Sequence, residues 1–188
     1  YSLVLAGECE PIKPGSGIIA GDISSIMSKA IPGFFRRMLH LIPPAGMLES
    51  IHDYKDRQET ISPYIAGKRL VSFSGLPGWN LPLLQKTVQM MGKQNAEQLW
   101  PHMEMFAHGG CSISPYKPII EKLFPSGSLV CIENYNASEG FFGVQTDSND
   151  PSMMLMLDYQ VFYEFIPMKE YGRADARVLP LWEVDTDE

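Results

Sequence analysis

The sequence has little of what secreted, membrane-spanning or nucleic-acid-binding proteins need. Its three cysteines, Cys9, Cys111 and Cys131, form no closely spaced pair, which favours a reducing compartment over a disulfide framework. We therefore expect a cytoplasmic protein. Uncharged apolar runs fall well short of the roughly 20 residues that a membrane-spanning helix requires, and a net charge of -7 lacks the basic excess that neutralises phosphates. Neither a membrane nor a nucleic acid is an expected partner.

The composition that remains is typical of a soluble globular domain. The 188 residues are 45% hydrophobic and 20% charged, which suffices for one domain with a proper core. No internal repeat, low-complexity stretch or interdomain linker divides the chain. The sequence therefore predicts a single α/β domain over residues 1–188, in which helices flank a mixed sheet.

Apolar periodicity alternates between the spacing of strands and that of helices along the chain. We expect strands at residues 1–5, 70–73, 103–107, 128–134, 141–145, 153–158 and 161–166. We expect helices at residues 23–30, 34–41, 47–65 and 81–91, near Glu97, and after Ser114, which is placed to cap a helix that begins with Pro115. Loops are expected at residues 10–17 and 74–79, and a turn at residues 147–151.

The segment from Leu129 to Gln145 carries the clearest chemical pattern. An apolar run meets Tyr135-Asn136-Ala137-Ser138-Glu139-Gly140, and the aromatic pair Phe141-Phe142 follows. In open α/β sheets ligand groups gather beyond the carboxyl ends of buried strands, so residues 135–139 are expected to line a crevice.

The residue types in this crevice suit a metal-bound phosphate. Mg2+ prefers oxygen ligands and keeps several waters, so one carboxylate such as Glu139 together with substrate phosphates is an ordinary arrangement. The Ser138 hydroxyl can bond a phosphate oxygen, and Tyr135 offers a flat face to a purine. From the residues alone, a strand-to-strand connection with a solvated glutamate remains the alternative interpretation.

Three segments of the sequence resemble a known family. Residues 134–145, His108-Gly109-Gly110 and Phe162-Tyr163-Glu164-Phe165-Ile166-Pro167 are similar to the plant auxin-responsive-promoter family of acyl acid amido synthetases and its bacterial relatives. These enzymes belong to the acyl-adenylate-forming, firefly-luciferase-like superfamily. Weaker likeness extends along the rest of the chain, including Ser74-Gly75-Leu76-Pro77-Gly78-Trp79 and Leu99-Trp100-Pro101.

The resemblance implies ATP-dependent adenylation of a carboxylic acid, followed by transfer of the acyl group to an amino acid or another amine. Glu139 would hold Mg2+ and ATP, with Ser138 beside it as the second catalytic residue. The residues implied to contact the nucleotide are Tyr135, Asn136 and Ala137 on one side and His108, Gly109 and Gly110 on the other. Trp79 and Phe142 are candidates for the acyl-acid pocket, although Trp79 can equally pack beneath a helix, and Gly109-Gly110 can form an ordinary turn.

The sequence also departs from this family. The family's earlier Ser/Thr/Gly-rich phosphate loop has no equivalent between Tyr1 and Met105, and its later ribose-binding stretch and carboxy-terminal subdomain are not found. We therefore expect an internal piece of the large amino-terminal domain of a longer enzyme. Such a piece would hold only part of the ATP and Mg2+ site and would be inactive in isolation.

Other chemistries are open at the level of sequence. A cysteine hydrolase or zinc site would use His102, His108 and Cys111, although their spacing matches no standard zinc pattern. Paired-carboxylate hydrolysis would use Glu139 with Asp147 or Asp150. A thiol acceptor such as coenzyme A, in place of an amine, and a noncatalytic domain that binds a nucleotide or a partner are further alternatives.

Overall fold

A computed structural model describes residues 1–5, 9–13, 15, 17–43, 47, 51 and 53–185. The chain divides into two compact units, Tyr1–Leu155 and Met156–Glu188. The first, here called the sheet unit, contains a seven-stranded sheet and its helices. Within the described residues no helix is long and apolar enough to cross a membrane.

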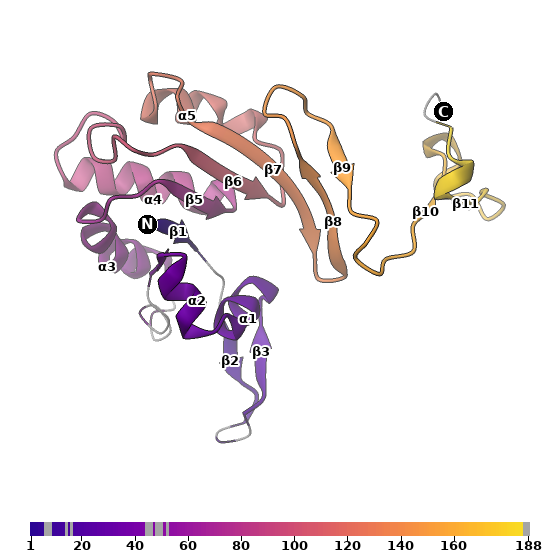
Figure 1. Cartoon of the computed structure of the whole chain (residues 1–188), viewed down its shortest axis with the longest axis horizontal. Coiled ribbons are helices and arrows are strands. Elements are labelled where there is room, and N and C mark those ends of the chain that lie inside the picture. The colour runs from indigo at the N-terminus through magenta and orange to yellow at the C-terminus, as the bar shows by residue number, and fades with distance from the viewer. Residues whose placement is uncertain are drawn as a thin grey trace. The chain divides into compact units, whose positions relative to one another are not determined.

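The sheet runs in the order β4-β1-β5-β6-β7-β8-β9 (Figure 1). Its strands are β1 (Ser2–Val4), β4 (Leu41–Ile42), β5 (Ser72–Gly75), β6 (Met105–Gly109), β7 (Val130–Ala137), β8 (Gly140–Gln145) and β9 (Met153–Leu155). The strands from β4 to β7 pair in parallel, whereas β8 and β9 are antiparallel. The predicted α/β class, with a mixed sheet flanked by helices, is confirmed.

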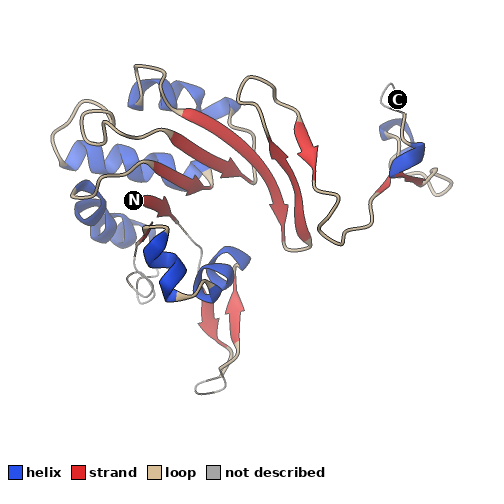
Figure 2. Cartoon of the chain, viewed as in Figure 1, coloured by secondary structure: helices blue, strands red, loops and turns tan. Residues whose placement is uncertain are grey.

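Three helices connect the parallel strands and cover one face of the sheet (Figure 2). They are α3 (Tyr54–Ala66), α4 (Pro77–Met90) and α5 (Lys117–Leu123). The successive crossovers from β4 through α3 to β5, through α4 to β6 and through α5 to β7 advance in the same direction along the sheet. Because such crossovers are right-handed, all three helices lie on one face.

Side chains at the helix ends set where α3 and α4 begin. The Asp53 carboxylate caps α3 by accepting hydrogen bonds from the Lys55 and Asp56 amides at 2.8 and 3.2 Å. Pro77 occupies the first turn of α4, where its missing N–H leaves no hydrogen bond unmade. The helix expected at residues 47–65 is therefore shorter, since described residues Met47 and Ile51 lie outside it.

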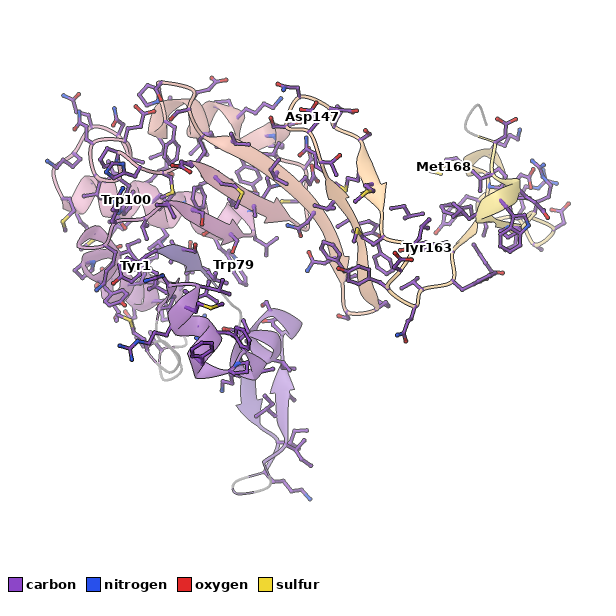
Figure 3. All side chains as sticks on the ribbon, in the orientation of Figure 1. Tyr1, Trp79, Trp100, Asp147, Tyr163 and Met168 are labelled. Carbon is purple, nitrogen blue, oxygen red and sulfur yellow. The ribbon has the colours of Figure 1, made fainter. Side chains whose placement is uncertain are left out.

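The core lies between this face of the sheet and the three helices. Phe73 and Phe106, on neighbouring strands, stack with their ring centroids 4.2 Å apart. Trp100 is buried beside α3 (Figure 3), where its indole Nε1 donates a hydrogen bond to the Ile65 carbonyl oxygen at 3.2 Å. The hydroxyl groups of Thr87 in α4 and Ser62 in α3 are hydrogen-bonded to each other at 2.9 Å, so the two helices are joined by a buried polar contact.

Several expected boundaries are wrong because buried apolar residues need not belong to strands. Leu70 and Met103 are buried, but their amides bond to the Lys68 and Trp100 carbonyl oxygens in turns. Strands β5 and β6 consequently begin two residues later than the apolar runs do. The residues around Glu97 form turns, not a helix.

Three further boundaries differ from those expected. Helix α4 starts at Pro77, within the loop predicted at residues 74–79. A 3-10 turn, η1 (Ser114–Tyr116), precedes α5, and Ser114 makes no capping hydrogen bond. In the predicted loop at residues 10–17, the strand β2 (Cys9–Pro11) pairs with β3 (Ile19–Gly21), ahead of α1 (Ile23–Ala30) and α2 (Gly33–Met38).

The second unit is small and contains little regular structure. Its strands β10 (Glu164–Phe165) and β11 (Leu179–Pro180) pair in antiparallel fashion, accompanied by the 3-10 turns η2 (Met168–Glu170) and η3 (Leu181–Glu183). The strand expected at residues 161–166 is thus reduced to two residues, and that at residues 153–158 ends at Leu155 as β9.

Truncating the core should destabilise the sheet unit strongly. We expect Phe106→Ala to lower the free energy of unfolding by about 3–5 kcal/mol, because it removes the ring that stacks on Phe73 and leaves a cavity. The matched control is Met105→Ala, whose side chain is 42% exposed on the other face of the same strand; it should cost less than about 1 kcal/mol. Urea unfolding followed by circular dichroism measures both, and equal losses would contradict this core.

Candidate functional site

The candidate site lies at the carboxyl ends of β5, β6 and β7. In the parallel register, His108 pairs with Gly75 on one side and with Glu133 on the other, and Gly109 pairs with Asn134. The His108-Gly109-Gly110 segment and the start of the segment 134–139 are therefore neighbours, although 23 residues lie between Gly110 and Asn134 in the sequence.

Strand β7 does not end where the sequence predicted. The strand expected to stop at Asn134 continues to Ala137, and Tyr135, Asn136 and Ala137 belong to it, not to a crevice-lining loop. The cause is the antiparallel partner β8, in which Gly140 pairs with Ala137. The two strands form a hairpin, here called the β7–β8 hairpin, that extends past the ends of β5 and β6 (Figure 1).

Ser138 and Glu139 form the two-residue turn of the β7–β8 hairpin, and both are exposed. Within the described part of the chain, neither side chain makes a hydrogen bond or an ion pair. The Glu139 carboxylate is thus accessible to a cation from solution.

The register of the hairpin shifts between Tyr135 and Asn136, which pair with Gly143 and Phe141. Phe142 is the extra residue of this bulge, and bulges re-aim side chains. The Tyr135 and Phe142 ring centroids lie 5.2 Å apart with an interplanar angle of 50°. Tyr135 remains 57% exposed, so one ring of this pair has surface available to a flat ligand.

A magnesium ion at Glu139 would have to draw most of its ligands from elsewhere. Among the described residues, no group of three or more His, Cys, Asp or Glu side chains is arranged to hold a metal. Mg2+ is often held by one or two carboxylates together with substrate phosphates and water. The lone, exposed Glu139 fits that arrangement and does not fit a metal site built from protein ligands alone.

Gly109 is required by the packing of β6 against β7. A Cβ at this position would lie 2.5 Å from the Asn134 carbonyl oxygen and 2.7 Å from its Oδ1, closer than van der Waals contact allows. At Gly110 the backbone has φ +79°, and a Cβ would meet Leu76 Cδ2 at 2.7 Å. The space that these glycines leave beside their Cα atoms is therefore occupied by Asn134 and Leu76.

His108 is 1% exposed, next to the Phe106 ring, whose centroid lies 5.3 Å away. Burial lowers the pKa of His108, and the nearby Glu133 carboxylate opposes this with a smaller upward effect on the same pKa. The imidazole is thus neutral at pH 7. Its Nδ1 is enclosed and has no hydrogen-bond partner among the residues that the structure describes, and the same is true of Asn80 Oδ1.

The acyl-pocket candidates lie on separate elements. Trp79, labelled in Figure 3, is in the first turn of α4. It is 41% exposed, so it does not pack fully beneath the helix. Its carbonyl oxygen accepts a hydrogen bond from Tyr54 Oη at 3.1 Å. Phe142 is in β8, three strand positions from β5, or roughly 14 Å across the sheet.

The alternative chemistries are not assembled. His102 precedes β6 and Cys111 follows it, so a strand of roughly 16 Å separates these two of the three proposed zinc or hydrolase residues. Glu139 and Asp147 similarly flank opposite ends of β8. The roughly 20 Å between these ends exceeds the carboxylate spacing of glycoside hydrolases.

The sequence interpretation missed two asparagines at this site, Asn80 behind Gly75 and Asn134 against Gly109. The position of Asn80, a polar residue three positions after the Pro77 that opens α4, could have indicated its role. Nothing in the sequence distinguished Asn134 from the other polar residues of its segment.

No protein-family model matches this chain, and no curated protein matches it either.

The close approach at Gly109 makes a sharp prediction. Gly109→Ala should lower the free energy of unfolding by about 2–4 kcal/mol, because the new methyl group overlaps a backbone oxygen that cannot move without disturbing β7. Gly33→Ala is the control, since nothing lies within 4 Å of its Cβ position, and should change stability by less than about 1 kcal/mol. Chemical unfolding of both variants checks this, and a neutral Gly109→Ala would refute the close approach.

Burial of His108 also predicts a pH dependence. Because the pKa of His108 is lower in the folded than in the unfolded chain, the unfolded chain binds more protons below about pH 6.5. The contribution of neutral His108 to the free energy of unfolding is therefore complete above that pH, and it declines as the pH falls toward the pKa of His108 in the folded chain. Between about pH 7.5 and about pH 5.5, wild type should lose more stability than His108→Gln. The exposed His102, as His102→Gln, should retain the wild-type loss, and identical pH profiles for wild type and His108→Gln would exclude this effect.

Proposed function

We propose that this chain carries part of the ATP and magnesium site of an acyl-adenylate-forming ligase. The enzyme would activate a carboxylic acid with ATP and transfer the acyl group to an amino acid or another amine. One observation supports this most directly. The two segments that resemblance assigns to opposite sides of the nucleotide, His108–Gly110 and Asn134–Glu139, meet at neighbouring strand ends, where Gly109 pairs with Asn134.

The chain's own residues would bind and orient the reactants. Glu139, exposed at the tip of the β7–β8 hairpin, would hold Mg2+, which when bound neutralises charge on the phosphates. The Ser138 hydroxyl beside it would donate to a phosphate oxygen. Tyr135, with Phe142 against it, would offer its exposed ring surface to the purine.

The proposed reaction requires no protein nucleophile. A carboxylate oxygen of the substrate attacks the α-phosphorus of ATP, and the bond to pyrophosphate breaks. The amine nitrogen then attacks the acyl carbon, loses a proton, and AMP leaves with the bonding electrons. Positioning and electrostatic stabilisation supply the rate enhancement in such transfers.

Magnesium-dependent ATP binding tests this proposal on the chain itself. Titration calorimetry should show binding in the presence of Mg2+ that weakens about tenfold or more in Glu139→Gln, because the neutral amide is a poor metal ligand. The control Glu121→Gln, on the exposed side of α5, should bind as wild type does. Binding unaffected by either substitution would exclude Glu139 as the metal ligand, and no binding would exclude the nucleotide site.

A further inference from the structure

Among the described residues of the sheet unit, two buried side-chain polar atoms have no hydrogen-bond partner. They are Asn80 Oδ1 and His108 Nδ1, and their residues are 0% and 1% exposed. Nearly all buried side-chain polar atoms in folded proteins are hydrogen-bonded, so each such exception requires an explanation. An unmet buried group costs about 1–3 kcal/mol, and here two occur in one small region.

Both side chains lie next to Gly75, on the same face of the sheet. Gly75 is the register partner of His108, so a side chain at Gly75 would point to the face that the imidazole occupies. A Cβ at Gly75 would lie 3.0 Å from Asn80 Nδ2. The Asn80 amide therefore covers Gly75, one strand spacing, or about 5 Å, from the backbone of His108.

The chemistry of the two groups is complementary. Asn80 Nδ2 donates to the Ser74 and Leu76 carbonyl oxygens at 3.2 and 3.1 Å, which fixes the orientation of the amide and leaves Oδ1 as an acceptor. An acceptor needs a donor. The neutral His108 ring can provide one at Nδ1 when the proton resides on that nitrogen.

We propose that one bridging water joins the two groups, accepting a hydrogen bond from His108 Nδ1–H and donating one to Asn80 Oδ1, and thereby fixes Nε2 of His108 as a hydrogen-bond acceptor. A water in such a position would have polar partners on both sides. Glu133 is the charged group that faces His108 from β7. Phe106 and the glycine neighbour contribute no charge.

His108 then acts as a specificity-determining residue at the site described above. Nε2 is not among the enclosed unpartnered atoms, and within the described residues no hydrogen bond to it is made. His108 directly precedes Gly109-Gly110 at the end of β6. Its Nε2, as a hydrogen-bond acceptor, favours ligands that present an amino group at this strand end. This inference rests on the proposed function. It predicts that the site binds a purine with a 6-amino group, as in ATP, more tightly than one with a 6-oxo group, as in GTP.

Nitrogen NMR of the histidine side chains in the wild-type chain tests the pair without any ligand. Free neutral histidine prefers the proton on Nε2, so a neutral His108 with its proton on Nδ1 is the distinctive expected result. Its assignment comes from the spectrum of His108→Asn, in which that signal disappears. A proton on Nε2 would overturn the proposal.

Nucleotide choice tests the consequence. His108→Asn keeps an amide donor near the Nδ1 position but has no Nε2. Wild type should bind ATP about tenfold or more tightly than GTP in the presence of Mg2+, and His108→Asn should reduce this ratio to within about threefold. An unchanged ratio would overturn the specificity role. If wild type binds neither nucleotide, the proposed function and the specificity role both fail, while the NMR spectrum still decides whether the Asn80–His108 pair exists.

Discussion

The close approach of β6 to β7 at Gly109 is the constraint on which the candidate site depends. The Asn134 backbone and amide oxygens occupy the space of a Gly109 side chain. Because glycine has no Cβ to overlap these oxygens, β6 and β7 can pair as far as Gly109 and Asn134. This pairing brings the glycine turn next to the base of the β7–β8 hairpin, and it sets where each chemically interesting side chain lies.

The hairpin places its polar residues far from the core. The tight turn exposes Ser138 and Glu139, and an exposed carboxylate is well hydrated and interacts weakly with a single charge. A ligand that binds there must bring several interactions of its own. A metal-bound nucleoside triphosphate, as proposed, would do so, because its phosphate oxygens coordinate a hard cation and accept hydrogen bonds, and its flat base could stack on the Tyr135 ring.

The interior of the site, in contrast to the hairpin tip, is built from buried polar side chains. Asn80 and His108 are buried beside Gly75, and a low-dielectric setting strengthens hydrogen bonds and raises the cost of leaving them unmade. Burial also lowers the pKa of His108, so the imidazole is a neutral hydrogen-bonding group at physiological pH. In the proposed site, the buried neutral ring of His108 and the hydrated carboxylate of Glu139 would contact the ligand in two different ways.

Local patterning by itself determined the α/β class, the helices around α3 to α5 and the turn after β8, because apolar spacing, capping residues and prolines act through near neighbours. Local patterning could not determine the length of β7, since Tyr135 to Ala137 are strand residues only when β8 pairs with them. It could not show that Leu70 and Met103 are buried in turns, or that Asn134 fills the space beside Gly109. The tertiary structure decided these points, because each depends on a contact between residues that are distant in sequence or on pairing with a neighbouring strand.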